Sequence, residues 1–245
     1  MEPMTISQIV ITAFGTSDAI GKGIVVLLGL VSVVAWSIMT NKFISVWSSA
    51  SSTSKFLKRY DTVRSALGMG LYLEELSGPL KNICKSGLDE LFGICNINER
   101  NGEQFLRKGV LPRRLTQAEL DKIKSTMNRT VNSEALSLDS SLGLLSVFVT
   151  ASPFCGLLGT VWGVMATFSN IASSGLIEIK LIAPGISGAL LTTVAGLIVA
   201  IPTVCANTLI NSMVNSLNLK MDIFVEDFLT SLRLEEADDS NGGDQ

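Results

Sequence analysis

The sequence predicts an all-α membrane protein with three transmembrane helices, and the distribution of charge is the main reason. Only 17% of the 245 residues are charged, whereas soluble domains carry about 25%. The charged residues leave three gaps, 23–41, 140–177 and 181–219, which are 19, 38 and 39 residues long. Because about 20 apolar residues cross the roughly 30 Å of hydrocarbon in a bilayer, each gap is long enough to span it.

The basic residues predict how the three helices are oriented. Fifteen of the 19 Lys and Arg residues lie between Lys42 and Arg129, and basic segments next to transmembrane helices stay in the cytoplasm. The second and third helices are longer than a bilayer requires, so we expect them to extend into the cytoplasm. The expected organisation is a periplasmic N-terminal segment (1–22), transmembrane helix 1 (23–41), a cytoplasmic helical region (42–139), transmembrane helix 2 (140–168), a periplasmic hairpin (169–180), transmembrane helix 3 (181–211), a cytoplasmic helix (212–234) and a disordered acidic tail (235–245).

The composition also excludes several classes of protein. The chain contains no His, so it has no catalytic pair of Ser or Cys with His, no His-ligated metal and no His proton relay. Its 22 acidic residues outnumber its 19 basic residues, which gives no support to nucleic-acid binding. It also has no nucleotide-binding glycine loop. We therefore expect no enzyme activity, no metal and no cofactor.

The cytoplasmic parts show the spacing of amphipathic helices. One helix is expected after Gly78 and Pro79, and a second after the capping-box pattern of Thr116 and Glu119. No breaker separates the second from the next transmembrane helix, so we expect the two to be continuous. The simplest interpretation is that these helices only pack and oligomerise. The apolar faces comprise Leu80, Ile83, Cys84, Leu88 and Leu91; Leu120, Ile123, Met127 and Val131; and, after transmembrane helix 3, Val214, Leu217, Met221, Phe224, Phe228 and Leu232.

Polar side chains form one stripe on each long transmembrane helix. Since hydrocarbon offers no water to a hydroxyl or amide, each stripe is expected to face other helices or a wet cavity. The alternative is that each Thr only bonds the carbonyl one turn earlier. The stripes comprise Ser146, Thr150, Thr160 and Thr167, and Thr192, Thr193, Thr203, Asn207 and Asn211.

Small residues and prolines on the same helices indicate close packing, and charged residues are absent. Glycines let helix backbones approach closely, and a proline inside a helix frees a carbonyl. Neither 140–177 nor 181–219 contains Asp, Glu, Lys, Arg or His. If the protein moves protons, a partner must therefore supply the carboxylate. The residues assigned to helix packing are Gly159, Gly163, Pro184, Gly185, Gly196 and Pro202.

Two segments, 152–165 and 182–202, closely resemble the signature segments of the TolQ/ExbB family, which is related to the flagellar stator subunit MotA. The three-helix arrangement is similar to TolQ and ExbB rather than to four-helix MotA. The resemblance implies a stator subunit of the bacterial inner membrane, driven by the proton motive force and assembled as a homopentamer in the lipid bilayer. It further implies that a TolR- or ExbD-like single-span protein occupies the central pore and supplies the Asp. The output would be work on a TolA- or TonB-like protein.

The resemblance assigns the pore-lining threonines of the family to Thr160 and Thr193. Thr192 and Thr150, on the same stripes, are expected beside them in the proton pathway. Asp139 matches an acidic position in relatives, where it either helps proton exit or is simply a charge at a helix end.

This chain departs from the family at Gly188, where relatives usually carry a Glu. The loss of this Glu supports an alternative function, in which the protein is a non-conducting oligomeric scaffold of the same fold. An intramembrane enzyme has little support, since only Cys155 and Cys205 remain as candidate nucleophiles in the long helices.

Overall fold

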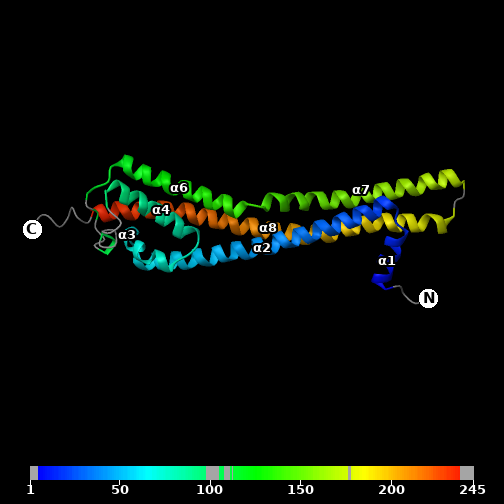
Figure 1. The fold of residues 1–245 in the computed structure, drawn as a ribbon, viewed down its shortest axis with the longest axis horizontal. Helices are drawn as coiled ribbons and strands as arrows, with labels where there is room; N and C mark the ends of the chain where they lie inside the picture. The colour runs from blue at the N-terminus through cyan, green and yellow to red at the C-terminus, as the bar shows by residue number, and fades with distance from the viewer. Residues whose placement is uncertain (1–4, 98–104, 108–110, 112, 176–177, 238–245) are drawn as a thin grey trace, which may run out of the picture. The chain divides into compact units, whose positions relative to one another are not determined.

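The computed structural model describes residues 5–97, 105–107, 111, 113–175 and 178–237. Within these residues there are helices and no strand, which confirms the predicted all-α class. The helices are α1 (Ile6–Thr16), α2 (Ala19–Val63), α3 (Ala66–Met69), the 3-10 helix η1 (Gly70–Glu75), α4 (Pro79–Ile94), α6 (Gln117–Asp139), α7 (Leu142–Ser174) and α8 (Ile179–Ala237) (Figure 1).

The three predicted spans lie in helices that are long and apolar enough to cross a membrane, within α2, α7 and α8. Large apolar side chains on these helices are exposed; Val33 of α2 and Phe154 of α7, for example, are each 70% exposed. Extensive apolar surface of this kind is unfavourable in water and favourable in lipid. The structure therefore confirms three helices suited to a bilayer.

The chain divides into two compact units. Unit 1 contains residues 1–42 and 141–209, and unit 2 contains residues 43–140 and 210–245. The core of unit 2 contains an aromatic cluster in which Phe56 and Tyr60 of α2 meet Phe224 of α8 edge to face. In the same unit, α4 packs against α6 (Figure 1). Every apolar residue predicted for the three cytoplasmic helix faces is buried.

The predicted capping box at the start of α6 is present. The backbone N–H of Glu119 donates to the Thr116 hydroxyl at 3.3 Å, and the N–H of Thr116 donates to the Glu119 carboxylate at 2.8 Å. The expectation that this helix continues into transmembrane helix 2 is wrong. Ser141 has φ 69° and separates α6 from α7. Serines favour such helix ends because their hydroxyls satisfy local backbone groups, as the Ser140 hydroxyl does by donating to Ser137 O at 2.8 Å.

Three further boundaries differ from the sequence analysis. A short helix, α1, occupies 6–16 in the expected N-terminal segment and precedes the start of α2 at Ala19. α7 continues to Ser174 and ends at Gly175, whose φ of 66° suits glycine, so the connection to α8 is shorter than the expected hairpin. α8 includes 235–237 of the expected tail, and 238–245 lie outside the described residues.

Candidate functional site

A cluster of three threonine hydroxyls lies between α7 and α8 in unit 1. The hydroxyls of Thr160, on α7, and Thr193, on α8, are hydrogen-bonded to each other. Both also approach the carbonyl oxygen of Gly156, which lies 3.2 Å from Thr160 Oγ1 and 3.1 Å from Thr193 Oγ1. Both side chains are half-buried. The structure thus brings together the two residues that the resemblance assigned to the pore.

Thr192 completes the cluster from a fully buried position. Its hydroxyl lies 3.0 Å from Gly156 O and 2.7 Å from Ala189 O, and Thr160 Oγ1 is 3.2 Å from the same Ala189 oxygen. Each hydroxyl has one proton to donate and can also accept. Three protons are therefore shared among two carbonyl oxygens and the hydroxyls themselves. The hydroxyls can exchange partners by rotation, without any movement of the helices.

Glycines make the close approach of α7 and α8 possible. A Cβ atom on Gly156 would lie 2.8 Å from Thr192 O, and one on Gly196 would lie 2.7 Å from Ser152 O. On Gly163 it would lie 2.7 Å from the Ala189 Cβ. Real Cβ contacts are longer than these, so a larger residue would force the helices apart. Of the other glycines assigned to packing from the sequence, Gly159 meets Thr192 and Gly185 meets Thr167 in the same way.

The remaining threonines of the two stripes bond only within their own helices. Thr167 and Thr203 each donate to the carbonyl four residues earlier at 2.7 Å. Thr150 is exposed and lies 3.2 Å from Ser146 O and 3.1 Å from Val147 O. These three threonines therefore match the alternative in which a Thr only bonds a carbonyl one turn earlier in its own helix. Thr160, Thr192 and Thr193 differ because they also bond across the helix pair.

Three other residues named from the sequence, Asp139, Pro184 and Pro202, are not part of the hydroxyl cluster. Asp139 is exposed at the end of α6, in unit 2. Pro184 lies inside α8, and its carbonyl oxygen accepts a hydrogen bond from the Thr16 hydroxyl at 3.3 Å. Pro202 also lies inside α8 and is half-buried.

Sequence reasoning missed an acidic residue, Asp18, that joins α2 to α7. Its Oδ1 accepts the backbone N–H of Gly21 at 2.8 Å, and its Oδ2 accepts the indole N–H of Trp162 at 2.7 Å. An Asp just before an apolar run is a known helix-start signal, so the cap was detectable. The bond to Trp162 was not, because 144 residues separate the two side chains.

Gly188, the departure from the family pattern, packs against α1 and the residue that follows it. A Cβ atom at this position would lie 3.0 Å from Ser17 Cα and 3.2 Å from Ala13 O. Both are backbone atoms, which cannot move aside as the end of a flexible side chain can. The absence of a side chain at 188 therefore provides the space in which α1 packs on α8.

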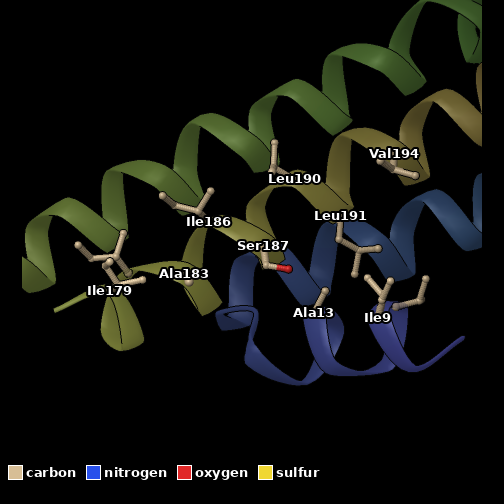
Figure 2. A pocket seen from close by; sticks show the side chains of 11 residues that line it. Ile9, Ala13, Ile179, Ala183, Ile186, Ser187, Leu190, Leu191 and Val194 are labelled. Atoms are coloured by element: carbon tan, nitrogen blue, oxygen red, sulfur yellow. The ribbon is translucent and has the colours of Figure 1, made fainter. Parts of the chain in front are cut away.

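An apolar groove of 740 Å³ lies between α1 and α8. Figure 2 shows side chains of Ile9 and Ala13, from α1, and of Ser187 and Leu191, from α8, pointing into the same space. Apart from the Ser187 hydroxyl, its lining side chains are aliphatic. The groove supplies no group that could carry a proton.

Metal and thiol chemistry receive no support in the part of the chain that the structure describes. No group of three or more Cys, Asp and Glu side chains there is placed to hold a metal ion. The four cysteines are free thiols. Burial raises the pKa of Cys84 in unit 2, and a protonated, buried thiol is unreactive.

Comparison with known proteins gives matches that include the region of α7 and α8 that holds the hydroxyl cluster. The model of the MotA/TolQ/ExbB proton channel family matches residues 97–223. The chain is 26% identical over 213 residues to the Tol-Pal system protein TolQ of Haemophilus influenzae, covering 85% of this chain and 87% of that protein. It is 28% identical over 217 residues to the biopolymer transport protein ExbB of Neisseria meningitidis serogroup B, covering 87% and 92%. The family match spans more than half of the chain and includes the whole hydroxyl cluster, so this multi-pass membrane protein belongs to the MotA/TolQ/ExbB proton channel family.

Proposed function

We propose that this protein is the proton-channel and stator subunit of a TolQ–TolR or ExbB–ExbD type complex. The complex couples the proton motive force across the inner membrane to work on a TolA- or TonB-like protein, in outer-membrane import or envelope integrity. The observation that carries the proposal is the hydroxyl cluster of Thr160, Thr192 and Thr193, placed between two helix segments, within 140–177 and 181–219, that contain no charged residue.

The chemistry of the cluster explains why a partner is required. Hydroxyls can accept and pass on hydrogen bonds, but at neutral pH they do not store a proton. A carboxylate can, and none occurs between residues 140 and 177 or between 181 and 219. A single-span TolR- or ExbD-like helix carrying an Asp supplies it. Thr160 and Thr193 then hydrogen-bond that carboxyl group or the waters leading to it.

The orientation that we propose is supported by the basic residues between Lys42 and Arg129. The N-terminus lies in the periplasm, unit 2 and the C-terminus lie in the cytoplasm, and the spans within α2, α7 and α8 cross the inner membrane. In this orientation α7 leads from the cytoplasm outward, so Asp139 and Thr150 lie on the cytoplasmic side of Thr160 and continue the pathway toward proton exit.

The subunits assemble as a homopentamer around the partner helices. A pore between subunits needs helices whose lipid-facing sides are apolar and whose packing sides are small or polar. The exposed Phe154 and the glycine-lined contact with α8 give α7 both kinds of side.

Purification from native membranes in mild detergent, followed by mass spectrometry and reconstitution into liposomes, tests the proposal. We expect a small single-span protein with an Asp in its span to co-purify. A proton gradient across the liposomes should then dissipate through the complex and not through the complex carrying an Asp→Asn partner. If the chain purifies alone as a homo-oligomer, or if the complex passes no protons, the proton-channel proposal fails and the non-conducting scaffold replaces it.

A further inference from the structure

A small polar cavity in unit 1 connects Asp18 with the hydroxyl cluster. The cavity has a volume of 120 Å³ and is lined by the start of α2, the end of α1, α7 and α8. A single water needs about 10–15 Å³ of such space and two or more polar partners, so the cavity has room for several waters. Its polar lining is supplied by Asp18, Thr16, Ser17, Thr167 and Asn170.

The lining changes from exposed to buried along the cavity. Asp18, Thr16 and Asn170 are exposed, whereas Ser17 and Thr167 are 8% and 7% exposed. The floor is built from residues without bulky side chains, Gly159, Gly188 and Ala189. Asp18 is therefore accessible from outside, whereas Ser17 and Thr167 line the cavity from within the helix bundle.

The floor of the cavity meets the hydroxyl cluster at Gly159. A Cβ atom on Gly159 would lie 2.6 Å from the Cβ of Thr192, so Gly159 both lines the cavity and packs directly against that threonine. Ala189 lines the cavity, and its carbonyl oxygen is 2.7 Å from Thr192 Oγ1 and 3.2 Å from Thr160 Oγ1. The cavity that Asp18 lines is thus also lined by two residues, Gly159 and Ala189, that contact Thr192 of the cluster.

Asp18 is the sole ionisable residue among those that line the cavity. α7 contains no charged residue, and between Leu181 and Leu219 α8 contains none. Lys22, one turn along α2, donates from Nζ to Gly15 O at 3.1 Å. The Asp18 carboxylate uses two acceptor positions for Gly21 and Trp162, and a carboxylate has about four. Two positions therefore remain for a proton or for water.

We propose that Asp18 is the proton-collecting group of this chain, at the periplasmic mouth of a water-filled passage to the hydroxyl cluster. This inference rests on the proposed function and adds to it a residue in this chain that binds the proton before the partner's carboxylate does. A hydronium ion outside transfers a proton to the Asp18 carboxylate and leaves water. The resulting carboxyl group gives that proton to a water in the cavity and returns to the carboxylate, so charge and atoms balance.

Gly188, the position at which the chain departs from the family pattern, lines the same cavity as Asp18. Ser17, next to Asp18, occupies the space that a side chain at 188 would enter. The chain therefore brings its acid to the cavity from the start of α2 instead of from α8.

The competing interpretation is that Asp18 only fastens α2 to α7. Two substitutions separate the interpretations in the reconstituted complex. Asp18→Asn keeps one oxygen, which can still accept the Gly21 N–H, but its NH₂ group cannot accept the Trp162 N–H, and the side chain cannot bind and release a proton. Trp162→Phe keeps the carboxylate and its cap but removes the fastening bond. We expect Asp18→Asn to lower proton flux by about a hundredfold, the lower end of what a positioned proton-transfer group contributes, and Trp162→Phe to retain flux. Unchanged flux in Asp18→Asn, or a loss confined to Trp162→Phe, overturns the inference.

An infrared measurement separates this inference from the proposed function. Difference spectra of the complex between acidic and neutral pH should contain a carboxyl band that disappears in Asp18→Asn and shifts when the bulk water is replaced by D₂O. Absence of such a band overturns the role of Asp18, even where the wild-type complex conducts. If the wild-type complex does not conduct but the band is present, the proposed function fails while the assignment of Asp18 as the group that binds the proton stands.

Discussion

The hydroxyl of Thr160 on α7 is hydrogen-bonded to the hydroxyl of Thr193 on α8, and both reach the carbonyl oxygen of Gly156. The pair links the two helices at a point where neither helix has a charged residue. Because each hydroxyl both donates and accepts, the pair offers a place where a proton-carrying group can be hydrogen-bonded without a fixed charge.

Replacing either hydroxyl by a methyl group should stop proton conduction. We expect Thr160→Val and Thr193→Val to abolish flux through the reconstituted complex, while costing only about 0.5–1.5 kcal/mol of stability, as for one hydrogen bond. Thr203→Val is the matched control, since Thr203 bonds only Val199 O of its own helix. Size-exclusion chromatography would report assembly and a pH-sensitive dye would report flux. Full flux in both cluster variants would remove the threonines from the pathway.

A methyl group on Gly159 should weaken the contact between α7 and α8. The added Cβ would lie 2.6 Å from Thr192 Cβ and 2.8 Å from Thr192 Cγ2, and Thr192 is fully buried. Overpacking of this kind costs about 1–3 kcal/mol. Gly143→Ala is the control on the same helix, because nothing lies within 4 Å of its Cβ position. Thermal unfolding in detergent should show a lower Tm for Gly159→Ala alone; equal values would contradict the observed contact.

An acidic side chain introduced at position 188 should displace α1. The Cβ of Gly188→Glu meets Ser17 Cα at 3.0 Å and Ala13 O at 3.2 Å, and the rest of the side chain requires more space. Gly188→Ala adds only the first atom and should have a smaller effect. Amide hydrogen exchange in α1 is expected to increase from wild type to Ala to Glu. If protection of α1 is the same in all three, the contact with α1 does not determine what position 188 tolerates.

The aromatic cluster of unit 2 should dominate its stability. Phe56 and Phe224 are both fully buried, with ring centroids 5.1 Å apart at 88°. Truncation of such a residue costs about 3–5 kcal/mol, so Phe224→Ala should shift denaturant unfolding strongly. Ile223→Ala is the control, because Ile223 is 50% exposed and surface substitutions stay within about 0.5 kcal/mol. Similar shifts in the two variants would contradict the assignment of the core.

The start of α6 should be acid-sensitive. The Arg113 guanidinium, 2.5 and 2.9 Å from the Glu119 carboxylate, together with the Thr116 N–H, lowers the pKa of Glu119 from 4.5 to about 2. A lowered pKa in the folded state stabilises the fold above the ordinary pKa, and this contribution is lost as the pH falls from 4.5 toward about 2.

Glu119→Gln should remove that pH dependence while preserving the cap, since Gln also serves in capping boxes. Amide exchange of the first turn of α6 measures the effect. Wild type should lose protection across this pH range and the variant should change less. Parallel curves would show that the ion pair with Arg113 does not stabilise the turn.

Several features of this protein were predictable because they depend on local sequence. Helical spacing identified the buried faces of α4, α6 and the second half of α8, and the Thr116–Glu119 pattern identified the cap. The absence of charge over 140–177 and 181–219 was enough to predict two long apolar spans. The polar stripes indicated which faces of α7 and α8 carry hydroxyls. The positions of α1 and of the break at Ser141 were not anticipated.

Periodicity determines the face on which a residue lies, but not what that face meets. Thr150 and Thr160 share a stripe, yet only Thr160 bonds across to α8, because the glycines that bring the helices together lie beside it. The bond between Asp18 and Trp162 and the contact of Gly188 with Ser17 join residues far apart in the chain. The sequence alone determined that the chain has three spans and that the two long ones carry no charged residue. Only tertiary packing, which places distant helices against one another, decided which hydroxyls form a cluster and which carboxylate faces the cavity beside it.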